Sequence, residues 1–348
     1  MRKILALTLA AALALAGCSR AAEAPSAPPA ATSPAAELRL GYFPNITHAP
    51  ALIGVANGFF AKELGSTKLT TQTFNAGPEE VSALLGGSLD AGFIGSSPAI
   101  NAFAKSNGEA VRLIAGSTSG GAQLVTSPDI TSPDQLKGKI IATPQKGNTQ
   151  DVAFKKWLKD NNLEGQVTVQ NLDNPRTLDL FRTNQIAGGW LPEPWSSRLV
   201  DAGAKVLVDE KTLWQNGQFP TTVLIVRTQY LQEHPDTVSA LIRGEQKAVD
   251  FTTTNAADAK KVTNDSIKQL TGSSLAPAVL DRSFTELQFT LDPLAATFPQ
   301  LAKDSVTAGV TDKETSLKGF IDVTALNGVL TQAGKPAVDA AGLDKAQG

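Results

Sequence analysis

The stretch LGGSLDAGFIG (residues 85–95) is echoed by RTNQIAGGWLP (residues 182–192). The two align without a gap at a spacing of 97 positions, and the matched pairs are Leu89–Ile186, Gly92–Gly189 and Phe93–Trp190. Each stretch reads as the end of a helix, a tight turn and a short buried strand. Unless the echo is due to chance, it predicts two similar α/β lobes rather than one long sheet.

The sequence around both stretches alternates between strand-like and helix-like segments. From Glu37, ELRLGYF and LTTQTF read as strands, whereas APALIGVANGFFAKEL and GPEEVSALLGGSL have helical spacing. The alternation restarts after Gln123 and runs to the strand-like TTVLIVRTQYL, and beyond Tyr230 the chain is mostly helical. This order predicts open α/β sheets. A ligand would then bind between the lobes, near the carboxyl ends of the strands.

The composition argues against several classes of protein. The chain has 348 residues, 42% of them hydrophobic, which suffices for two globular lobes. A net charge of −2 argues against a nucleic-acid partner, which would need a basic stripe. One cysteine, Cys18, and two histidines, His48 and His234, argue against a thiol or zinc enzyme. No carboxylate cluster has metal-loop spacing, so we predict neither a metal nor a cofactor.

The N-terminus reads as a secretory signal. Arg2 and Lys3 precede an apolar run that is too short to span a membrane. We predict a signal peptide at 1–17, followed by an Ala/Pro/Ser-rich tether at 18–36 that cannot pack a core. No later segment is apolar enough to span a membrane. The predicted product is a soluble body outside the cytoplasm.

Four turns lie where the cleft is expected, at 41–50, 95–99, 116–123 and 146–151. Each offers small residues and backbone N–H groups, and helix N-termini bind anions without a buried arginine. The hydroxyls of Ser96, Ser97, Ser119 and Thr149 add donors. Alternatively, Ser97 or Asn148 only caps its own helix.

The stretch GGWLPEPW (188–195) places two tryptophans and a glutamate just beyond a predicted strand. Trp190 and Trp195 would wall a carbon chain, and Glu193 would face a cation or accept a hydrogen bond. In the alternative, both tryptophans belong to the core. His48 has no serine or cysteine nucleophile in a recognisable elbow, so it is read as a pocket hydrogen-bond donor or a surface residue. We predict no catalytic residue.

Several stretches together carry a family resemblance: GYFPNITHAP, DAGFIGSSPA, LKGKIIATPQKGNTQDVAF, GGWLPEPW and LVDEKTLW. In these motifs the chain resembles the solute-binding lipoproteins of ABC importers for aliphatic sulfonates, taurine and nitrate. The resemblance runs from about residue 38 to past 230 and weakens in the helical C-terminal third. The segment ending at Cys18 similarly resembles a lipobox, in which that cysteine is lipidated. An ordinary signal peptide with an incidental cysteine is the alternative.

The resemblance implies a fold and a domain layout. The fold would be α/β, of the periplasmic-binding-protein type II class, with two lobes, a hinge and an interlobe ligand cleft. Lobe one would hold 37–121 and 229–340, lobe two 122–228, and 341–348 would form a tail.

The resemblance also implies a site. The residues around the anion would be Asn45, Ser96, Ser97, Ser119, Gly120, Gly147, Asn148 and Thr149. Trp190, Glu193 and Trp195 would line the rest, with His48 nearby. The family pattern usually has an acidic residue where this chain has Ala187, which puts the end of that strand in doubt.

The implied function is capture of a small oxyanion-bearing solute and delivery to a membrane permease with its ATPase. The two tryptophans favour an aliphatic sulfonate over bare nitrate, and Glu193 leaves room for taurine; a thiamine-pyrimidine precursor is a further alternative. We expect a monomer, in the periplasm or anchored to the cell membrane through a lipid on Cys18. The competing classes are an enzyme on the same fold and a sensor lipoprotein.

Overall fold

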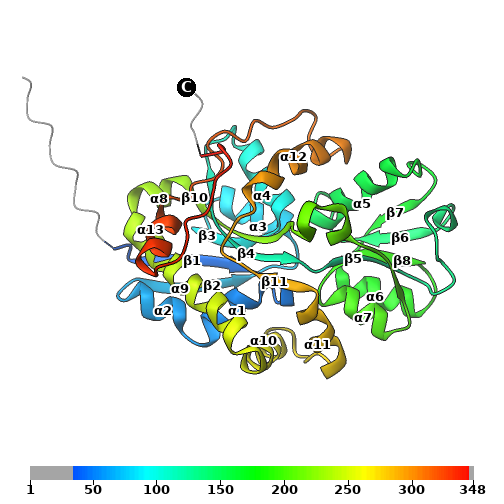
Figure 1. Cartoon of the computed structure of the whole chain (residues 1–348), viewed down its shortest axis with the longest axis horizontal. Coiled ribbons are helices and arrows are strands. Elements are labelled where there is room, and N and C mark those ends of the chain that lie inside the picture. Colours follow the sequence, from blue (N-terminus) through cyan, green and yellow to red (C-terminus); the bar gives the residue numbers. More distant parts are fainter. Residues whose placement is uncertain (1–33, 345–348) are drawn as a thin grey trace, which may run out of the picture. The chain divides into compact units, whose positions relative to one another are not determined.

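The computed structural model describes residues 34–344, which form two β-sheets flanked by helices (Figure 1). The first sheet has the order β11-β4-β10-β3-β1-β2, and the second has the order β7-β6-β8-β5-β9. The first-sheet strands are β1 (Glu37–Tyr42), β2 (Lys68–Thr73), β3 (Ala91–Ile94), β4 (Val111–Gly120), β10 (Pro220–Arg227) and β11 (Leu287–Phe289). The second-sheet strands are β5 (Ala122–Thr126), β6 (Ile140–Thr143), β7 (Thr168–Asn171), β8 (Gly188–Pro192) and β9 (Lys205–Asp209). The predicted signal peptide and Cys18 lie outside the described residues.

The echoed stretches occupy equivalent places in the two sheets. In the first, β1 pairs in parallel with β2 and β3, and in the second, β6 pairs in parallel with β7 and β8. Gly92 lies opposite Gly41, and Gly189 lies opposite Ala142. A Cβ at Gly92 would overlap the carboxylate of Glu80, so a larger residue there would require that buried side chain to move. The prediction of two similar α/β lobes is confirmed.

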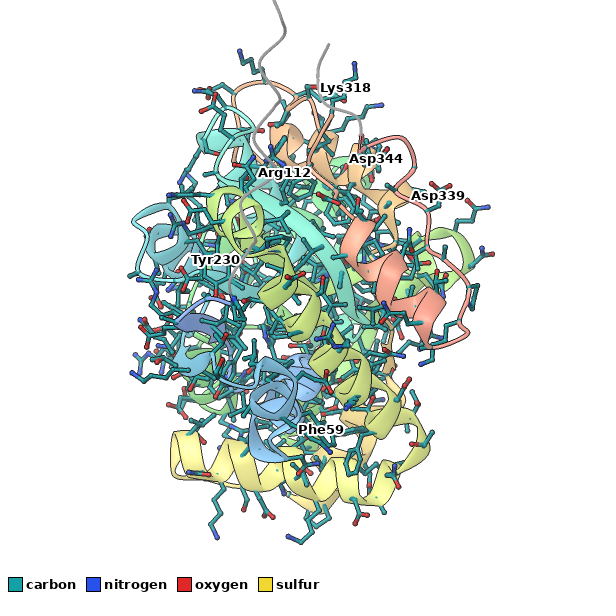
Figure 2. The ribbon with its side chains drawn as sticks, turned by 90° about the vertical axis from the view of Figure 1, so that its left-hand side faces the viewer. Phe59, Arg112, Tyr230, Lys318, Asp339 and Asp344 are labelled. Carbon is teal, nitrogen blue, oxygen red and sulfur yellow. The ribbon has the colours of Figure 1, made fainter. Side chains whose placement is uncertain are left out.

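Helices cover both sheets. Those of the first lobe are α1 (Ala49–Ala56), α2 (Phe59–Leu64), α3 (Gly77–Leu85), α4 (Ser96–Lys105), α8 (Thr228–Glu233), α9 (Pro235–Thr254), α10 (Ala256–Thr271) and α13 (Thr324–Gln332). Those of the second lobe are α5 (Thr149–Asp160), α6 (Asn174–Arg182) and α7 (Trp195–Asp201). Figure 2 shows the first lobe from its end, where α9 and α13 pack together. Nearby, the Tyr230 hydroxyl donates to the carbonyl of Glu37 at 2.9 Å and ties α8 to β1.

The hydrophobic cores follow from the periodicity of each element. In α5, Val152, Phe154, Trp157 and Leu158 recur at helical spacing and are all buried. In the first lobe, Phe60 and Phe93 are fully buried and pack at 6.0 Å between ring centroids. Within residues 34–344 no helix is both long and apolar enough to cross a membrane.

The predicted lobe boundary at residue 228 is wrong. Strand β10 lies between β3 and β4 of the first sheet, so the chain re-enters lobe one at Pro220. The strand is buried along nearly its whole length, as befits a central strand that is covered on both faces. The earlier crossing lies at Gly121, between β4 and β5, where a φ of +71° suits glycine.

The C-terminal third contacts both lobes rather than the first alone. Helix α11 (Pro277–Thr285) packs against α7 of lobe two, and also against α10. Helix α12 (Phe298–Thr307) packs against both α4 and α5, and it lies above them in Figure 1. Residues 287–289, which read as helix in the sequence, form β11 instead, because they pair with β4.

Candidate functional site

A small cavity lies where the carboxyl ends of the two sheets meet. Its volume is about 20 Å³, and the residues that line it follow β1, β2, β3, β6 and β7, or end β8 and begin β10. The lining residues are Phe43, Asn45, Thr47, His48, Asn75, Gly95, Asn148, Thr149, Gln150, Asn174, Pro192, Thr221 and Thr222. We call this the deep cavity. Its position is the one that open α/β sheets use for ligands.

The deep cavity is polar but carries no formal charge. Its one titratable residue is His48, and burial lowers the pKa of that imidazole to about 3. The backbone N–H of Phe43 donates to His48 Nδ1 at 3.3 Å, which leaves Nε2 as the proton-bearing nitrogen. His48 is therefore a neutral donor, as one of its two predicted roles required, and it is not exposed.

Helices from both lobes begin beside this cavity. A Cβ on Gly95, the N-cap of α4, would overlap the hydroxyl of Thr149, the first residue of α5. Glycine at position 95 thus lets the two lobes approach closely. The first N–H groups of each helix have no partner within the helix, so both helix termini present donors to the same space.

Several buried side chains at this junction have no hydrogen-bond partner. They are the hydroxyls of Ser96, Ser97, Thr149 and Thr222, together with the side-chain oxygen of Asn174. Thr149, Thr222 and Asn174 line the deep cavity, whereas Ser96 and Ser97 begin α4 next to the lining residue Gly95 and line neither cavity. All of these residues are at most 9% exposed. A buried hydroxyl without a partner costs stability, so a concentration of them points to a ligand that would satisfy them.

The turn before α5 is held by its own side chains. Asp151 is fully buried, and its carboxylate accepts from the Gly147 N–H at 2.9 Å and from Lys155 Nζ at 2.8 Å. Asn148 caps α5 by accepting from the Thr149 N–H at 3.1 Å. The prediction that the Gly147 backbone binds the anion is therefore wrong, because its donor is occupied. The side-chain oxygen of Asn148 caps its own helix, which was the alternative to anion binding for this residue.

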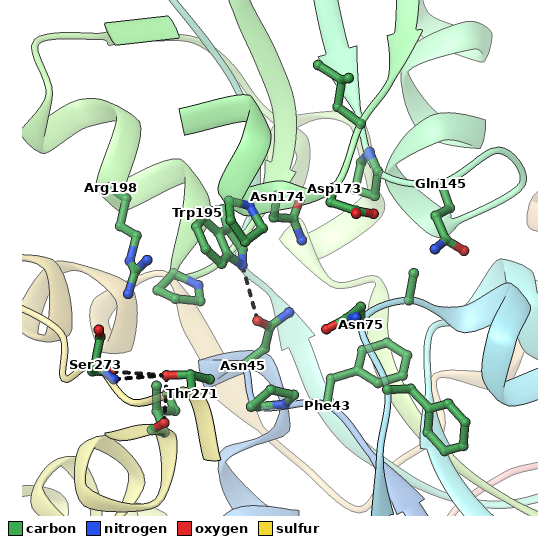
Figure 3. A pocket seen from close by; sticks show the side chains of 18 of the residues that line it. Phe43, Asn45, Asn75, Gln145, Asp173, Asn174, Trp195, Arg198, Thr271 and Ser273 are labelled. Carbon is green, nitrogen blue, oxygen red and sulfur yellow. Dashed lines mark hydrogen bonds between the residues drawn. The ribbon is translucent and has the colours of Figure 1, made fainter. Parts of the chain in front are cut away.

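A larger cavity of about 330 Å³ adjoins the deep one (Figure 3). The two share Phe43, Asn45, Asn75 and Asn174. Its other lining residues are Pro44, Phe74, Ala76, Pro144, Gln145, Leu172, Asp173, Pro175, Pro194, Trp195, Arg198, Ile267, Thr271, Ser273 and Leu275. We call this the outer cavity. Aromatic and aliphatic walls with a few polar groups suit the carbon part of a small solute.

Contacts between the lobes close the site. Trp195 Nε1 donates to Asn45 Oδ1 at 3.2 Å, and Gln145 Nε2 donates to Glu79 Oε1 at 2.8 Å. Each bond joins a residue of lobe two to a residue of lobe one. Figure 3 shows the first of them spanning the cavity. Trp195 is partly exposed: it lines the outer cavity and also packs against the core of lobe two, so both interpretations of this residue describe part of its surroundings.

Trp190 does not line the cleft, contrary to one of its two interpretations. It is fully buried beside Phe154 and Trp157 in the core of lobe two. Its Nε1 donates to Glu210 Oε2 at 2.7 Å. The physical reason is that β8 is covered on both faces, so alternate residues of the strand are all enclosed.

Glu193 is not free to meet a ligand amine. Its carboxylate accepts from Arg282 Nη1 and from the Ser283 hydroxyl, both at 2.9 Å, and from the Ser197 N–H at 3.2 Å. The residue is fully buried, and these donors fasten α11 to the start of α7. The prediction that Glu193 faces the solute is wrong for this reason.

Ser119 and Gly120 belong to the hinge rather than to either cavity. The Ser119 hydroxyl accepts from the Phe219 N–H at 3.3 Å, and the Gly120 carbonyl accepts from the Thr221 hydroxyl. Gly120 has a φ of +80°. These contacts hold together the two strands that cross between the lobes. The Gly120 N–H donates to the Phe219 carbonyl at 3.3 Å, and neither Ser119 nor Gly120 lines the deep or the outer cavity, so the structure does not support the predicted anion contacts.

Sequence reasoning missed some lining residues that its own rule would have found. Asn75 follows the predicted strand LTTQTF, and Asn174 lies just beyond β7, in the region of predicted alternation after Gln123. Applying the strand-end rule to every strand would have included both. Thr222 and Arg198 gave no such signal, since one lies within a strand and the other within a helix.

The fold and the cleft together define the class: this is an α/β protein with the periplasmic-binding-protein fold of the second type. A family model described as the NMT1-like family matches residues 31–264. That is more than half of the 348 residues, and the chain belongs to the NMT1-like family.

Curated relatives and solved structures agree with this assignment. The taurine-binding periplasmic protein of Escherichia coli (strain K12) is 32% identical over 198 residues, which is 56% of this chain and 60% of that protein. The alkanesulfonate-binding protein SsuA of Xanthomonas axonopodis pv. citri, bound to MOPS, has a TM-score of 0.69 at 21% identity, over 81% of this chain and 96% of that one. The periplasmic nitrate-binding protein NrtA of Synechocystis PCC 6803 gives 0.72 at 13%, over 87% and 90%. The chain thus covers about three fifths of the curated relative, and the solved structures support the fold.

Proposed function

We propose that this protein is the extracytoplasmic solute-binding component of an ABC importer, and that its solute is a small organic oxyanion such as an aliphatic sulfonate. The observation that carries the proposal is the set of unpartnered buried hydroxyls at the start of α4 and α5. The two helices come from different lobes. A ligand bound between them would contact both lobes only when the cleft is shut, which favours the closed state.

The deep cavity favours an anion that binds to neutral donors. Hydroxyls, helix N-termini and the Nε2–H of His48 all donate, and no lining carboxylate would repel an anion there. Our proposed anion-binding set is Asn45, His48, Ser96, Ser97, Asn148 and Thr149, with Asn75 and Asn174 added. Trp195 would wall the tail of the solute in the outer cavity.

The names of the relatives support a binding protein rather than an enzyme. They are described as taurine-, alkanesulfonate- and nitrate-binding proteins, and two are described as periplasmic. By analogy we place this chain outside the cytoplasm and assign it a permease and an ATPase as partners. Lipid anchoring through Cys18 and a monomeric state are further parts of the proposal.

A ligand screen tests the proposal directly. The purified full chain, in mild detergent, is melted with alkanesulfonates, taurine, nitrate, sulfate and a pyrimidine precursor. A ligand present at 100 times its Kd should stabilise the chain by about 2.7 kcal/mol. We expect the largest rise in Tm from an alkanesulfonate.

A double variant, Ser97→Ala with Thr149→Val, identifies the site. Both hydroxyls are buried and unpartnered, so their removal should leave the Tm of the free protein nearly unchanged. Each hydrogen bond to a charged ligand contributes about 1.5–3 kcal/mol, so we expect at least a hundredfold weaker binding, by about 3 kcal/mol. The matched control, Ser82→Ala with Thr183→Val, changes exposed hydroxyls and should bind normally. No shift with any oxyanion would overturn the sulfonate assignment, and a shift with nitrate alone would replace it.

A further inference from the structure

The outer cavity contains a cation that lacks an acidic partner. Arg198, in α7, lines this cavity and is partly buried. No carboxylate of residues 34–344 forms an ion pair with it, and the neighbouring charge that acts on it is the like charge of Arg182. Arg282, partly buried on the adjoining helix, is different because Glu193, Ser197 and Gln123 all accept from it.

Packing holds the Arg198 guanidinium in place. It lies over the Trp195 ring, with its central carbon 4.5 Å from the ring centroid. In Figure 3 the guanidinium points toward Thr271 and Ser273, at the side of the cavity away from Asp173. Burial and the nearby Arg182 lower the pKa of Arg198, but a guanidinium keeps its charge at neutral pH. A partly desolvated and oriented fork of donors is suited to a carboxylate or a similar oxyanion.

The outer cavity is correspondingly unsuited to an ammonium group. The face of the Trp195 ring is already in cation–π contact with Arg198, and Trp195 Nε1 donates a hydrogen bond to Asn45 Oδ1. Glu193, the buried acid of this region, is engaged by Arg282 and Ser283. The acid that does line the cavity, Asp173, is exposed to solvent. A cationic tail would therefore meet Arg198 without a buried counter-charge.

The two cavities adjoin and share four lining residues, so one solute could contact both. Asn45 lines each of them and accepts from Trp195, on which Arg198 is stacked. We propose that the solute is a dianion: one oxyanion sits in the deep cavity, at the unpartnered hydroxyls that line or adjoin it, and a carboxylate or similar acid on its tail binds Arg198. This inference rests on the proposed function, because it assumes that the deep cavity holds the first oxyanion.

Calorimetry with three matched ligands tests the inference. The probes are 3-sulfopropanoate, 3-sulfopropanamide and 3-aminopropane-1-sulfonate. All three keep the sulfonate, and their tails end in a carboxylate, an uncharged amide and an ammonium group. Each is titrated into the purified full chain at 0.15 M salt. We expect 3-sulfopropanoate to bind at least about tenfold more tightly than the amide, as a charge-assisted bond predicts. The ammonium analogue should bind most weakly.

Variants assign the preference to one side chain. In Arg198→Gln, the acid and the amide should bind within about threefold of each other, whereas Arg198→Lys should keep part of the preference. The matched control is Arg176→Gln, an exposed arginine on α6 that lines neither cavity, and it should keep all of it. The Tm of each free variant shows whether it is folded.

The outcomes separate the two proposals. Equal affinity of the wild-type chain for acid and amide, or a preference that survives in Arg198→Gln, would overturn the dianion inference alone. Tightest binding of the ammonium analogue would overturn it as well and would place the tail near Asp173. If none of the three sulfonates binds, the proposed function fails together with this inference.

Discussion

The turn after β3 and the turn after β8 occupy the same place in their respective sheets but are filled in opposite ways. In lobe one, the hydroxyls of Ser96 and Ser97 are buried without partners. In lobe two, the carboxylate of Glu193 accepts from Arg282, Ser283 and a backbone N–H. One framework thus serves two purposes: the first turn keeps its donors available, and the second fastens a helix of the C-terminal third.

The contrast extends to other buried acids. In lobe one, neither oxygen of Glu80 or of Glu245 makes a hydrogen bond of good geometry. In lobe two, Glu210 accepts from Trp190, and Glu193 accepts from several donors. Lobe one therefore carries more polar groups whose burial costs stability. Three changes test this difference, taken from the largest expected effect to the smallest.

Glu245→Gln should change the pH dependence of stability most. Burial raises the pKa of Glu245 from 4.5 to about 8, and the nearby Ser117 offsets only part of that rise. Below about pH 4.5 the carboxyl is neutral in both states. As pH rises toward 8, the unfolded state loses its proton first, so stability falls, by up to about 5 kcal/mol in all. The variant should lose this contribution in urea unfolding measured at pH 5 and pH 8.5.

The expected profile of Glu245→Gln is less steep but not flat. Burial also raises the pKa of Glu210 to about 8, and that group remains in the variant. Glu109→Gln, an exposed change in the same lobe, should reproduce the wild-type profile. If the free energy of unfolding changed equally with pH in the wild type and in Glu245→Gln, the Glu245 carboxyl would not be destabilising lobe one.

Glu193→Ala should destabilise the chain by about 2–3 kcal/mol. Removing one partner of a buried ion pair leaves the other uncompensated, and we discount the usual cost because the Arg282 side chain is 24% exposed. The counterpart in lobe one, Ser96→Ala with Ser97→Ala, should leave stability unchanged or raise it. Chemical denaturation of both variants checks the pair, and equal losses would contradict the contrast between the two turns.

Trp190→Phe should cost about 1–2 kcal/mol and leave ligand affinity unchanged. The substitution copies Phe93 of lobe one into lobe two and removes the donor to buried Glu210. Urea unfolding measures the loss of stability, and calorimetry with an alkanesulfonate measures the affinity. A higher Kd for the variant would show that Trp190 contributes to ligand binding. The reverse substitution, Phe93→Tyr, is not a matched test because it adds a hydroxyl to the core of lobe one.

The sequence predicted the frame well because its signals are local. Alternating periodicity depends only on neighbouring residues, and the echo at 85–95 and 182–192 compares two such local patterns; together they predicted both sheets. The strand-end rule located the deep cavity, although it was not applied to the turns that hold Asn75 and Asn174.

The errors concern partners that are distant in the chain. The sequence around Glu193 gives no sign that its charge is neutralised by Arg282, which lies 89 positions away. Nor does the pattern of β10 show which sheet it joins, because a continuous apolar run fits a central strand of either lobe. Trp190 read equally well as core or as cavity wall, since a strand covered on both faces has no alternation to separate them.

The position of α12 gives the C-terminal third a part in setting affinity. This helix rests on α4 and on α5, the two helices that start at the deep cavity. If the lobes separate, as the proposed function requires, α12 would lose its contacts with one of these helices, so the α12 contacts would contribute to the equilibrium between open and closed forms. Since apparent Kd varies inversely with the fraction of binding-competent molecules, substitutions on α12 would then change the affinity for the proposed solute without contacting it.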